Sequence, residues 1–476
     1  MSASPDVAAL ALRVQLASFA GPSLPPDWAA LLAEGLGGIC LFGSNLTGTA
    51  EDVATLAAAV RAAGPRALVA LDEEGGDVTR LHTREASPVP GAAVLGAVDD
   101  LDLTRAVGAA VGAELASLGI DLDLGPVADV NSNPDNPVIG TRSFGADPAR
   151  VGRHVAAWVE GLQAEGVAAC VKHFPGHGDT AQDSHLTLPV LAAPADVVRA
   201  RELRPFAVAV AGGAAAVMTS HLLAPALDPD HPATLSAPVL GLLRDELGFD
   251  GAIVSDALDM AGASASRGIP EAAVLALAAG CDLLCIGPDK DAGLVRDVQA
   301  AIVTAVDAGR LPLARLTDAA TRVADLPRSA ALAGTKSPGC GVEVGRLAAA
   351  ARAACLVEGP LPDLTGAGAR VVSIVTEANI AVGPGRWGLV ADLEVAAGEP
   401  LPDAALVVQV RDAHRRPEVA AALAAHPGPL VVVEWGWPGP RTGWAHAPHA
   451  RICTQGNGQP SIAAVTEILR EAGLDR

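Results

Sequence analysis

Aromatic residues and lysine are scarce in this sequence. Tyrosine is absent, aromatic residues make up 3% of the 476 positions, and only three of the 33 basic side chains are lysine. The absence of tyrosine removes one kind of catalytic nucleophile and a common platform for stacking against a ligand ring. Acidic side chains number 54, so the formal net charge is −21. That charge excludes nucleic acid or an anionic membrane surface as the main partner, because both bind basic patches.

The sequence also lacks a disulfide framework and long apolar runs. Seven cysteines, an odd number, are scattered over the chain, which is typical of a reducing compartment. Cys281 and Cys285 share one apolar run, where we interpret them as buried strand thiols. No apolar run reaches the roughly 18 residues of a membrane span. The N-terminal stretch has no basic segment and is interrupted by Arg13 and Gln15. We therefore expect a cytoplasmic protein without a membrane span.

Seven short apolar runs end in polar or glycine-rich segments, at residues 37–45, 67–75, 120–130, 167–178, 214–222, 251–260 and 280–288. Each run is typical of a parallel strand that is buried on both faces. Alanine-rich segments with helical periodicity lie between most of them, for example at 52–63, 103–118 and 151–165. This alternation predicts either a (β/α) barrel or a doubly wound sheet. No eighth strand is evident, so the pattern leaves closure of a barrel open.

The composition and the strand–helix pattern of the sequence change beyond about residue 324. A stretch with Pro, Gly, Ser and Lys is typical of a linker, and new strand patterns follow at 370–377, 404–411 and 429–437. We predict an α/β protein with a TIM-like (β/α) barrel over residues 1–325. A linker over 326–345 would connect it to a smaller three-layer α/β sandwich domain over 346–476.

The densest group of chemically active side chains follows the fourth apolar run. Residues 172–180 read KHFPGHGDT and residues 183–185 read DSH. Glycine and proline in this segment favour an irregular loop. The carboxylate of Asp183 can accept the N–H of the His185 ring, which fixes the tautomer, raises the basicity of the ring and suits a general acid/base. A metal site and a purely structural loop are the alternatives, because the same residue types also ligate metals.

Two carboxylates lie where apolar strands run out, the position in which barrel enzymes place their chemistry. Asp256 ends the run at 251–260, and Asp72 has the same placement in the run at 67–75. A strand-end aspartate can also act only as the N-cap of the following helix. We expect Asp259, three residues beyond Asp256, to cap or begin that helix.

Four segments carry a wider resemblance: residues 71–76 (LDEEGG) with Arg80, residues 139–145 (IGTRSFG), residues 172–185, and residues 255–260 (SDALDM). Together they resemble family 3 of the glycoside hydrolases, in its N-acetyl-β-glucosaminidase branch. Residues 172–185 are the most specific of the four segments. The resemblance extends from about residue 37 to residue 287 and more weakly to the C-terminus.

This resemblance implies a retaining glycosidase in which Asp256 is the nucleophile and His185, supported by Asp183, is the acid/base. Sugar contacts are expected from Asp72, Arg80, Arg142, Lys172, His173 and Met218. Nearby cations would keep the nucleophile ionised by lowering its pKa. The sequence departs from the family at Asp77, since an arginine usually follows the paired glycines. The guanidinium which that arginine brings to the site in the family is therefore missing at this position.

We accordingly expect a retaining exo-β-N-acetylglucosaminidase that removes terminal β-linked N-acetylglucosamine and needs no cofactor or metal. Its substrates would be small carbohydrates such as muropeptide fragments of peptidoglycan recycling, chitobiose or other glycosides. Three alternatives remain. A neutral histidine acid/base would not repel phosphate, which suits a phosphorylase; a β-glucosidase of the same family is the second alternative. The third is a non-catalytic sugar-binding protein, in which Asp77 would be a sign of lost activity.

The predicted second domain adds one rival residue and most of the tryptophans. Other branches of the family take a glutamate from this domain as the acid, so Glu434 competes with His185 for that role. We favour His185 because the loop at 183–185 makes a second acid redundant. Four of the six tryptophans also lie here, at positions 387, 435, 437 and 444. We interpret them as packing residues rather than as platforms for sugar rings.

Overall fold

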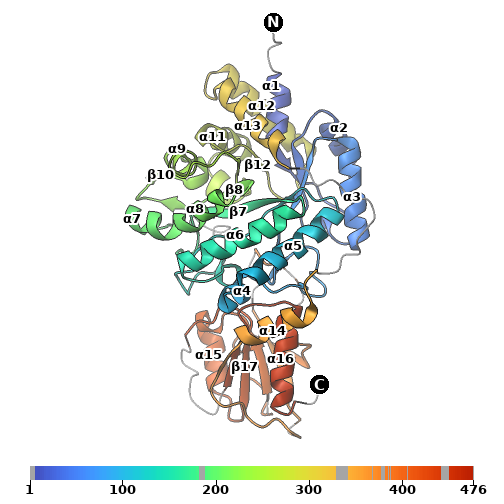
Figure 1. The fold of residues 1–476 in the computed structure, drawn as a ribbon, viewed down its shortest axis with the longest axis vertical. Helices are drawn as coiled ribbons and strands as arrows, with labels where there is room; N and C mark the ends of the chain where they lie inside the picture. Colours follow the sequence, from blue (N-terminus) through green and yellow to red (C-terminus); the bar gives the residue numbers. More distant parts are fainter. Residues whose placement is uncertain are drawn as a thin grey trace.

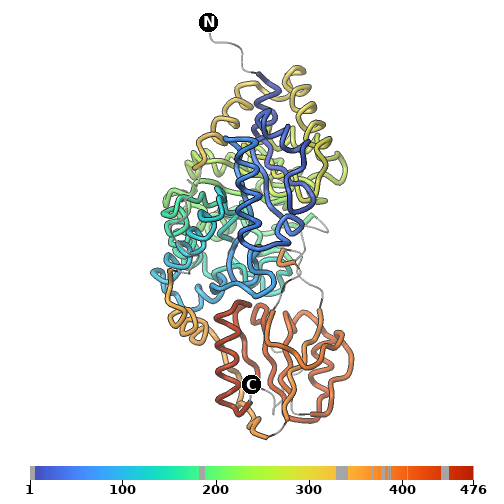
Figure 2. The backbone as a smooth tube through the Cα atoms, turned by 90° about the vertical axis from the view of Figure 1, so that its right-hand side faces the viewer, coloured from blue at the N-terminus to red at the C-terminus, as the bar shows by residue number. Residues whose placement is uncertain are grey.

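The chain forms two units that lie one beyond the other along the long axis of the molecule (Figures 1 and 2). The computed structural model describes residues 6–181, 188–327, 341–366, 368–376, 381–383, 385, 387–404, 406–440 and 450–474. The larger unit contains the N-terminal strands and helices, and the smaller one contains the elements from α14 (Val344–Ala354) onward.

Eight parallel strands form the centre of the larger unit. In the order of the sheet they are β11 (Ala252–Val254), β8 (Ala216–Thr219), β7 (Ala168–Phe174), β6 (Leu122–Asp123), β3 (Leu68–Leu71), β2 (Gly38–Cys40), β1 (Gln15–Ala17) and β12 (Leu284–Cys285). An isolated parallel bridge between Val254 and Leu283 joins the two ends of this order. The predicted TIM-like barrel is therefore confirmed.

The missing eighth strand is β1, which the sequence pattern did not reveal. It has only three residues, and Gln15 lies among them with a fully buried side chain. The Nε2 atom of Gln15 donates to the carbonyl of Ala11 at 3.0 Å, so the local backbone satisfies part of the amide. A buried polar residue in so short a strand interrupts the apolar pattern by which the other seven strands were recognised.

Helices surround the barrel and explain why its strands are apolar on both faces. The main ones are α1 (Val7–Arg13), α2 (Pro26–Ala33), α3 (Ala50–Ala63), α4 (Ala92–Val98), α5 (Leu101–Ser117), α6 (Pro148–Ala164), α8 (Leu203–Ala211), α11 (Ile269–Ala279), α12 (Ala292–Asp307) and α13 (Leu313–Asp325). Along β3, Leu68 and Ala70 pack inside the barrel, whereas Val69 and Leu71 pack against the outer layer of helices. This alternation gives two apolar cores, as layered packing in a barrel requires.

Short elements complete the loops of the barrel. They are the hairpin of β4 (Glu73–Gly75) and β5 (Val78–Thr79), the pair β9 (Leu223–Ala224) and β10 (Asp228–Pro232), and the helices α7 (Ala195–Val197), α9 (Ala237–Gly241) and α10 (Ala261–Ser264). Several helices begin at an aspartate or threonine whose side chain accepts a backbone N–H, as at Thr49, Asp100 and Asp147. Such caps stabilise helix starts and favour short strand-to-helix connections.

The smaller unit is a three-layer α/β sandwich, as the sequence predicted. Its sheet has the order β13 (Leu356–Glu358), β18 (Ala450–Cys453), β17 (Leu430–Glu434), β16 (Leu406–Val410), β14 (Arg370–Val375) and β15 (Leu393–Ala396). All neighbours are parallel except β13 and β18. Helix α15 (Pro417–Ala424) covers one face and α16 (Gln459–Glu471) the other. Ala351 of α14 packs between Val94 of α4 and Ala464 of α16, which ties the two units together.

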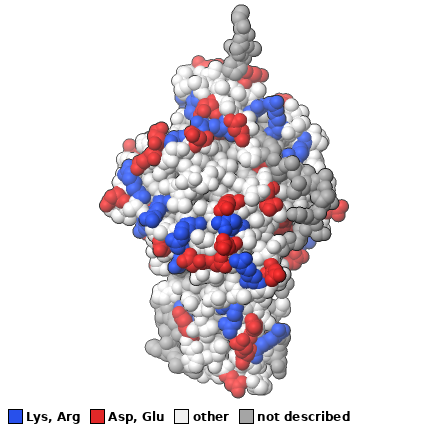
Figure 3. Space-filling view, viewed as in Figure 1, with Lys and Arg blue, Asp and Glu red and all other residues white. Residues whose placement is uncertain are grey.

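Charged side chains of both signs are interspersed on the face of the molecule that Figure 3 shows. The net charge of −21 is therefore spread rather than concentrated on this face. None of the helices within the described ranges has both the length and the apolar character that crossing a bilayer requires.

Candidate active site

A pocket of about 660 Å³ opens at the carboxyl ends of the barrel strands. Phe42 follows β2, Asp72 follows β3, Leu124 follows β6 and Asp256 follows β11, and all four line the pocket. The sequence-predicted residues that also line it are Arg80, Arg142, Lys172, His173 and Met218. The structure therefore brings together seven of the nine predicted site residues at the end of the barrel where such enzymes carry their chemistry.

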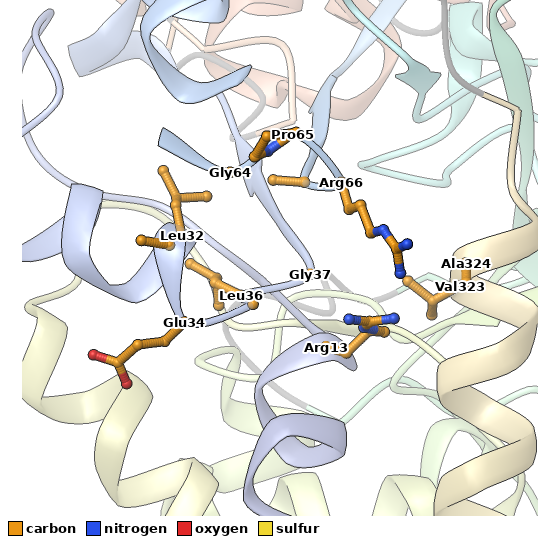
Figure 4. A pocket seen from close by; sticks show the side chains of 13 residues that line it. Arg13, Leu32, Glu34, Leu36, Gly37, Gly64, Pro65, Arg66, Val323 and Ala324 are labelled. Atoms are coloured by element: carbon orange, nitrogen blue, oxygen red, sulfur yellow. The ribbon is translucent and has the colours of Figure 1, made fainter. Parts of the chain in front are cut away.

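A second pocket, of about 550 Å³, lies at the opposite end of the barrel. Arg13 precedes β1, and Gly37 and Ala67 precede β2 and β3. Figure 4 shows Arg13 and Arg66 extending into this pocket from two sides. Glu34, its acidic residue, forms an ion pair with Arg296 on α12 at 2.6 Å. The charged network and the two histidines described below line the first pocket, at the carboxyl ends of the strands.

Lys172 is the centre of the charged network in the site. It lies on β7 with only 2% of its surface exposed, and its Nζ is 2.7 Å from both Asp72 Oδ1 and Glu74 Oε1. Arg142 binds Glu74 in a bidentate manner, with Nε at 2.9 Å and Nη2 at 2.7 Å. Arg80 Nη2 lies 3.8 Å from Asp72 Oδ2. Forked cations and carboxylates of this kind offer paired donors and acceptors to adjacent hydroxyl groups.

The electrostatics of this network keep Glu74 and Lys172 charged. Burial alone would raise the pKa of Glu74, but Arg142 and Lys172 outweigh it and hold that pKa well below its usual range. Burial would likewise lower the pKa of Lys172, yet the carboxylates of Asp72 and Glu74 raise it overall. In the sequence, Glu74 lies within residues 71–76 but was given no role. Its position two residues after the strand-end Asp72 is the sequence signal that could have identified it as a site residue.

Asp129 organises the histidines of the site and was not predicted. It is fully buried after β6, and its Oδ2 lies 2.7 Å from His173 Nδ1. Its Oδ1 accepts the backbone N–H groups of His173 at 3.2 Å and His177 at 2.7 Å. Burial opposes ionisation, but His173 and His177 lower the pKa of Asp129 overall. An ionised Asp129 only accepts hydrogen bonds, so His173 carries its proton on Nδ1 and presents Nε2 as an acceptor.

His177 is a further pocket residue without a role in the sequence analysis. Its Nδ1 lies 2.8 Å from Thr180 Oγ1, and burial lowers its pKa to about 4. The loop around it is tightly packed, because a Cβ on Gly178 would lie 1.8 Å from the carbonyl oxygen of Val130. Glycine at this position therefore permits the close approach of two backbone segments.

Asp256 is half-buried at the end of β11, and its Oδ1 accepts the backbone N–H of Ala257 at 2.8 Å. Asp259 does not cap the next helix, contrary to the prediction. Helix α10 begins at Ala261 with Met260 as its N-cap residue, and the Asp259 carboxylate instead pairs with Lys290 at 2.8 Å. The lysine comes from the loop after β12, a tertiary partner that local sequence could not indicate.

The predicted acid/base pair Asp183 and His185 falls in residues 182–187, which lie outside the described residues. Their roles therefore stay predictions. Among the described residues, no group of three or more His, Cys, Asp or Glu side chains is arranged to hold a metal ion.

The carboxylate of the rival acid Glu434 binds backbone groups of the second domain. It is 1% exposed, and its carboxylate accepts backbone N–H groups of Asp412 at 2.7 Å, Ala413 at 2.9 Å and Gly436 at 2.7 Å. Burial raises its pKa to about 7. Glu434 does not line the pocket. It therefore stabilises a turn in the second domain rather than facing a bound sugar.

The tryptophans of the second domain that the structure describes are packing residues. Trp435 is fully buried and donates its Nε1–H to Gln409 at 3.2 Å. Trp387 lies beneath the guanidinium of Arg411, and Trp437 lies 3.6 Å from the position of a Cβ on Gly140. None of the three lines the pocket. Trp444 lies outside the described residues.

A parallel (β/α) barrel with clustered carboxylates, cations and histidines at the carboxyl ends of its strands is the architecture of a barrel enzyme, a class that includes glycoside hydrolases. The model of the glycosyl hydrolase family 3 N-terminal domain matches residues 26–326, more than half of the chain. The chain belongs to this family.

Individual relatives agree with this assignment. Beta-hexosaminidase A of Pseudoalteromonas piscicida is 35% identical over 332 residues, which cover 64% of this chain and 55% of that protein. The chain thus spans about half the length of that relative. Beta-hexosaminidase LpqI of Mycobacterium tuberculosis is 37% identical over 316 residues, covering 64% of this chain and 77% of LpqI. The structure of a family 3 β-N-acetylglucosaminidase from Paenibacillus sp. str. FPU-7 superposes with a TM-score of 0.86 at 30% identity, covering 98% of this chain and 97% of the other.

Proposed function

We propose that the chain is a retaining, exo-acting β-N-acetylhexosaminidase that removes terminal β-linked N-acetylglucosamine. The observation that carries this proposal is the pocket that Asp256 lines together with Lys172, Asp72 and Arg142. The β-hexosaminidase and β-N-acetylglucosaminidase names of the relatives support the choice of sugar. A pocket of about 660 Å³ suits a terminal sugar with part of its aglycone.

In the proposed reaction, Asp256 attacks the anomeric carbon, and the bond to the leaving oxygen breaks as that oxygen receives a proton from His185. Asp183 orients His185 through its ring N–H. Water deprotonated by His185 then attacks the anomeric carbon of the covalent glycosyl-enzyme, which releases Asp256 and retains the anomeric configuration.

The charged network would hold the hydroxyl groups of the sugar. His173 offers an acceptor at Nε2, and Lys172 and Arg80 offer donors beside the acceptor oxygens of Asp72. Met218 contributes an apolar surface to the same pocket. We further propose that the substrates are small N-acetylglucosamine glycosides, such as muropeptide or chitobiose fragments, which the enzyme processes in the cytoplasm during peptidoglycan recycling.

A panel of aryl β-glycosides that differ only at C2 tests this proposal. We expect turnover of the N-acetylglucosaminide to exceed that of the glucoside by roughly 10-fold or more, since a site shaped for a polar substituent discriminates against its absence. A preference for the glucoside would contradict the proposed specificity. The same assay in phosphate and in a non-phosphate buffer separates hydrolysis from phosphorolysis. Sugar 1-phosphate as the main product in phosphate would contradict a hydrolase.

A further inference from the structure

The second domain contacts the barrel next to the active-site pocket. Two carbonyl groups of its segment 381–382 accept hydrogen bonds from Arg80, at 2.8 Å for Ala381 and 3.2 Å for Val382. Ala381 also lines the pocket. A guanidinium expected to bind the sugar is therefore held partly by the second domain.

Arg80 lies directly after the hairpin of β4 and β5, and Asp77 lies at the turn of that hairpin. The base of the hairpin is fixed within the barrel, because Glu73 Oε2 accepts the backbone N–H of Arg80 at 2.8 Å. At its turn, the side chain of Asp77 is 3% exposed and forms an ion pair with Arg411 of the second domain. The backbone of the turn packs closely against the backbone at Gly91, because a Cβ on Gly76 would lie 2.4 Å from the Cα of Gly91. This close packing restricts movement of the turn.

Arg411 is itself fixed by its surroundings. It follows β16, and the next residues are held by Glu434, whose carboxylate accepts the N–H groups of Asp412 and Ala413. The Arg411 guanidinium lies 5.8 Å from the centre of the Trp387 ring. Burial lowers the pKa of Arg411, while the carboxylates of Asp412 and Glu434 act in the opposite direction. A buried cation needs a close counter-charge, and Asp77 supplies it from the other domain.

We propose that Asp77 and Arg411 form a positioning pair through which the second domain sets Arg80 in the sugar pocket. The pair fixes the turn of the hairpin, the carbonyls of Ala381 and Val382 fix the guanidinium, and Arg80 consequently lies 3.8 Å from Asp72. This inference rests on the proposed function and assigns to the second domain a share in substrate binding. At the position of Asp77 the family usually has an arginine. Here the guanidinium comes instead from Arg411 of the second domain, which pairs with Asp77.

The pair has a kinetic consequence that differs from that of a catalytic group. Arg80 contacts bound sugar rather than the leaving oxygen, so its displacement weakens ground-state and transition-state binding alike. Loss of the pair should therefore raise KM and leave kcat nearly unchanged. A residue with only a structural role would lower the amount of folded enzyme without changing KM.

A double-mutant cycle tests the pair: Asp77→Asn, Arg411→Met and the two together, in the full-length chain. Each single variant leaves one buried charge without its partner, and we expect a rise in KM of roughly 10-fold at similar kcat. The double variant removes both charges, so its KM should rise by less than the product of the two single effects. Arg411→Lys keeps the charge and should recover part of the loss. Arg346→Ala, which breaks an exposed ion pair with Asp100 between the same domains, should leave KM unchanged.

Hydrogen–deuterium exchange of residues 73–81 provides a readout that does not depend on turnover. We expect faster exchange of this segment in both single variants and unchanged exchange in Arg346→Ala. Unchanged KM and unchanged exchange in Arg411→Met, or single effects on KM that simply multiply, would overturn the inference. Wild-type protein that hydrolyses no aryl glycoside would instead overturn the proposed function, and the exchange measurement would still decide whether the pair positions the hairpin.

Discussion

The Asp129 carboxylate binds His173 at both its ring and its backbone. Oδ2 lies 2.7 Å from the ring Nδ1, and Oδ1 accepts the backbone N–H at 3.2 Å. This double contact fixes both the rotation of the ring and its tautomer, so Nε2 is directed towards Arg142 Nη2 at 3.5 Å. The orientation of a proposed sugar contact thus depends on a carboxylate that does not line the pocket.

Asp129→Asn should impair the site while preserving the size of the side chain. The amide loses the charge that holds the proton on His173 Nδ1, and hydrogen bonds to charged groups contribute about 1.5–3 kcal/mol. We expect kcat/KM for an aryl N-acetylglucosaminide to fall roughly 10-fold or more. Asp135→Asn, which changes an exposed aspartate of the following loop, is the control and should have little effect. Equal kinetics for both variants would show that Asp129 does not position His173.

Lys172→Met should destabilise the protein strongly. It would leave the carboxylates of Asp72 and Glu74 in a buried site without their shared cation, and breaking a buried ion pair costs about 3–5 kcal/mol. Lys290→Met is the matched control, because Lys290 and Asp259 form a more exposed pair that contributes about 0–1 kcal/mol. Urea unfolding measures both values. A loss of unfolding free energy as small as that of the control would contradict the network described for Lys172.

Glu73 should make the protein less stable as pH rises. Burial raises its pKa to about 7 from a usual value of 4.5, so above pH 4.5 the native state keeps a proton that the unfolded chain releases. The unfolding free energy therefore falls by about 3 kcal/mol on passing from pH 4.5 to above pH 7. Glu73→Gln cannot ionise and should lose less stability over this window. Urea unfolding at pH 5 and pH 8 measures the change, with the exposed Glu51→Gln as the control. Parallel pH dependence in wild type and Glu73→Gln would refute the assignment.

Gly178→Ala should disturb the loop that carries His177. A Cβ at this position would lie 1.8 Å from the carbonyl oxygen of Val130, and both backbones would have to move. Overpacking of this kind costs about 1–3 kcal/mol. Gly43→Ala is the comparison, since nothing lies within 4 Å of its added Cβ. Thermal unfolding that shifts equally in the two variants would argue against the close approach of the two loops.

Most of the barrel could be predicted from sequence, because strands buried on both faces give uninterrupted apolar runs. The strand that escaped detection, β1, contains buried Gln15, whose Nε2 donates to the carbonyl of Ala11. In the second domain β14, β16 and β17 were recognised in the same way. The edge strands β13 and β15 were missed, since they have partly exposed residues and are only three and four residues long. The inner strand β18 was also missed, because its four residues include the buried Arg451, which interrupts the apolar pattern.

The residues of the site were predictable where they lie in specific motifs at strand ends. Residues whose function depends on a distant partner were not. Asp129 acts through His173, 44 positions away, and Asp77 through Arg411 in the other domain. Asp259 was predicted to cap a helix from its place after a strand end. Its actual partner, Lys290, lies in the next strand–helix connection, which local sequence does not indicate. Long-range pairing of this kind leaves no mark in local sequence patterns.

The most direct test of the proposed mechanism is to trap the glycosyl-enzyme. A 2-fluoro sugar with a good leaving group slows breakdown of the intermediate, so the labelled residue can be identified by peptide mass spectrometry. The account predicts a single covalent label on Asp256 and loss of labelling and of nearly all turnover in Asp256→Asn. A label on any other residue, or an Asp256→Asn variant that still turns over substrate at the wild-type rate, would contradict it.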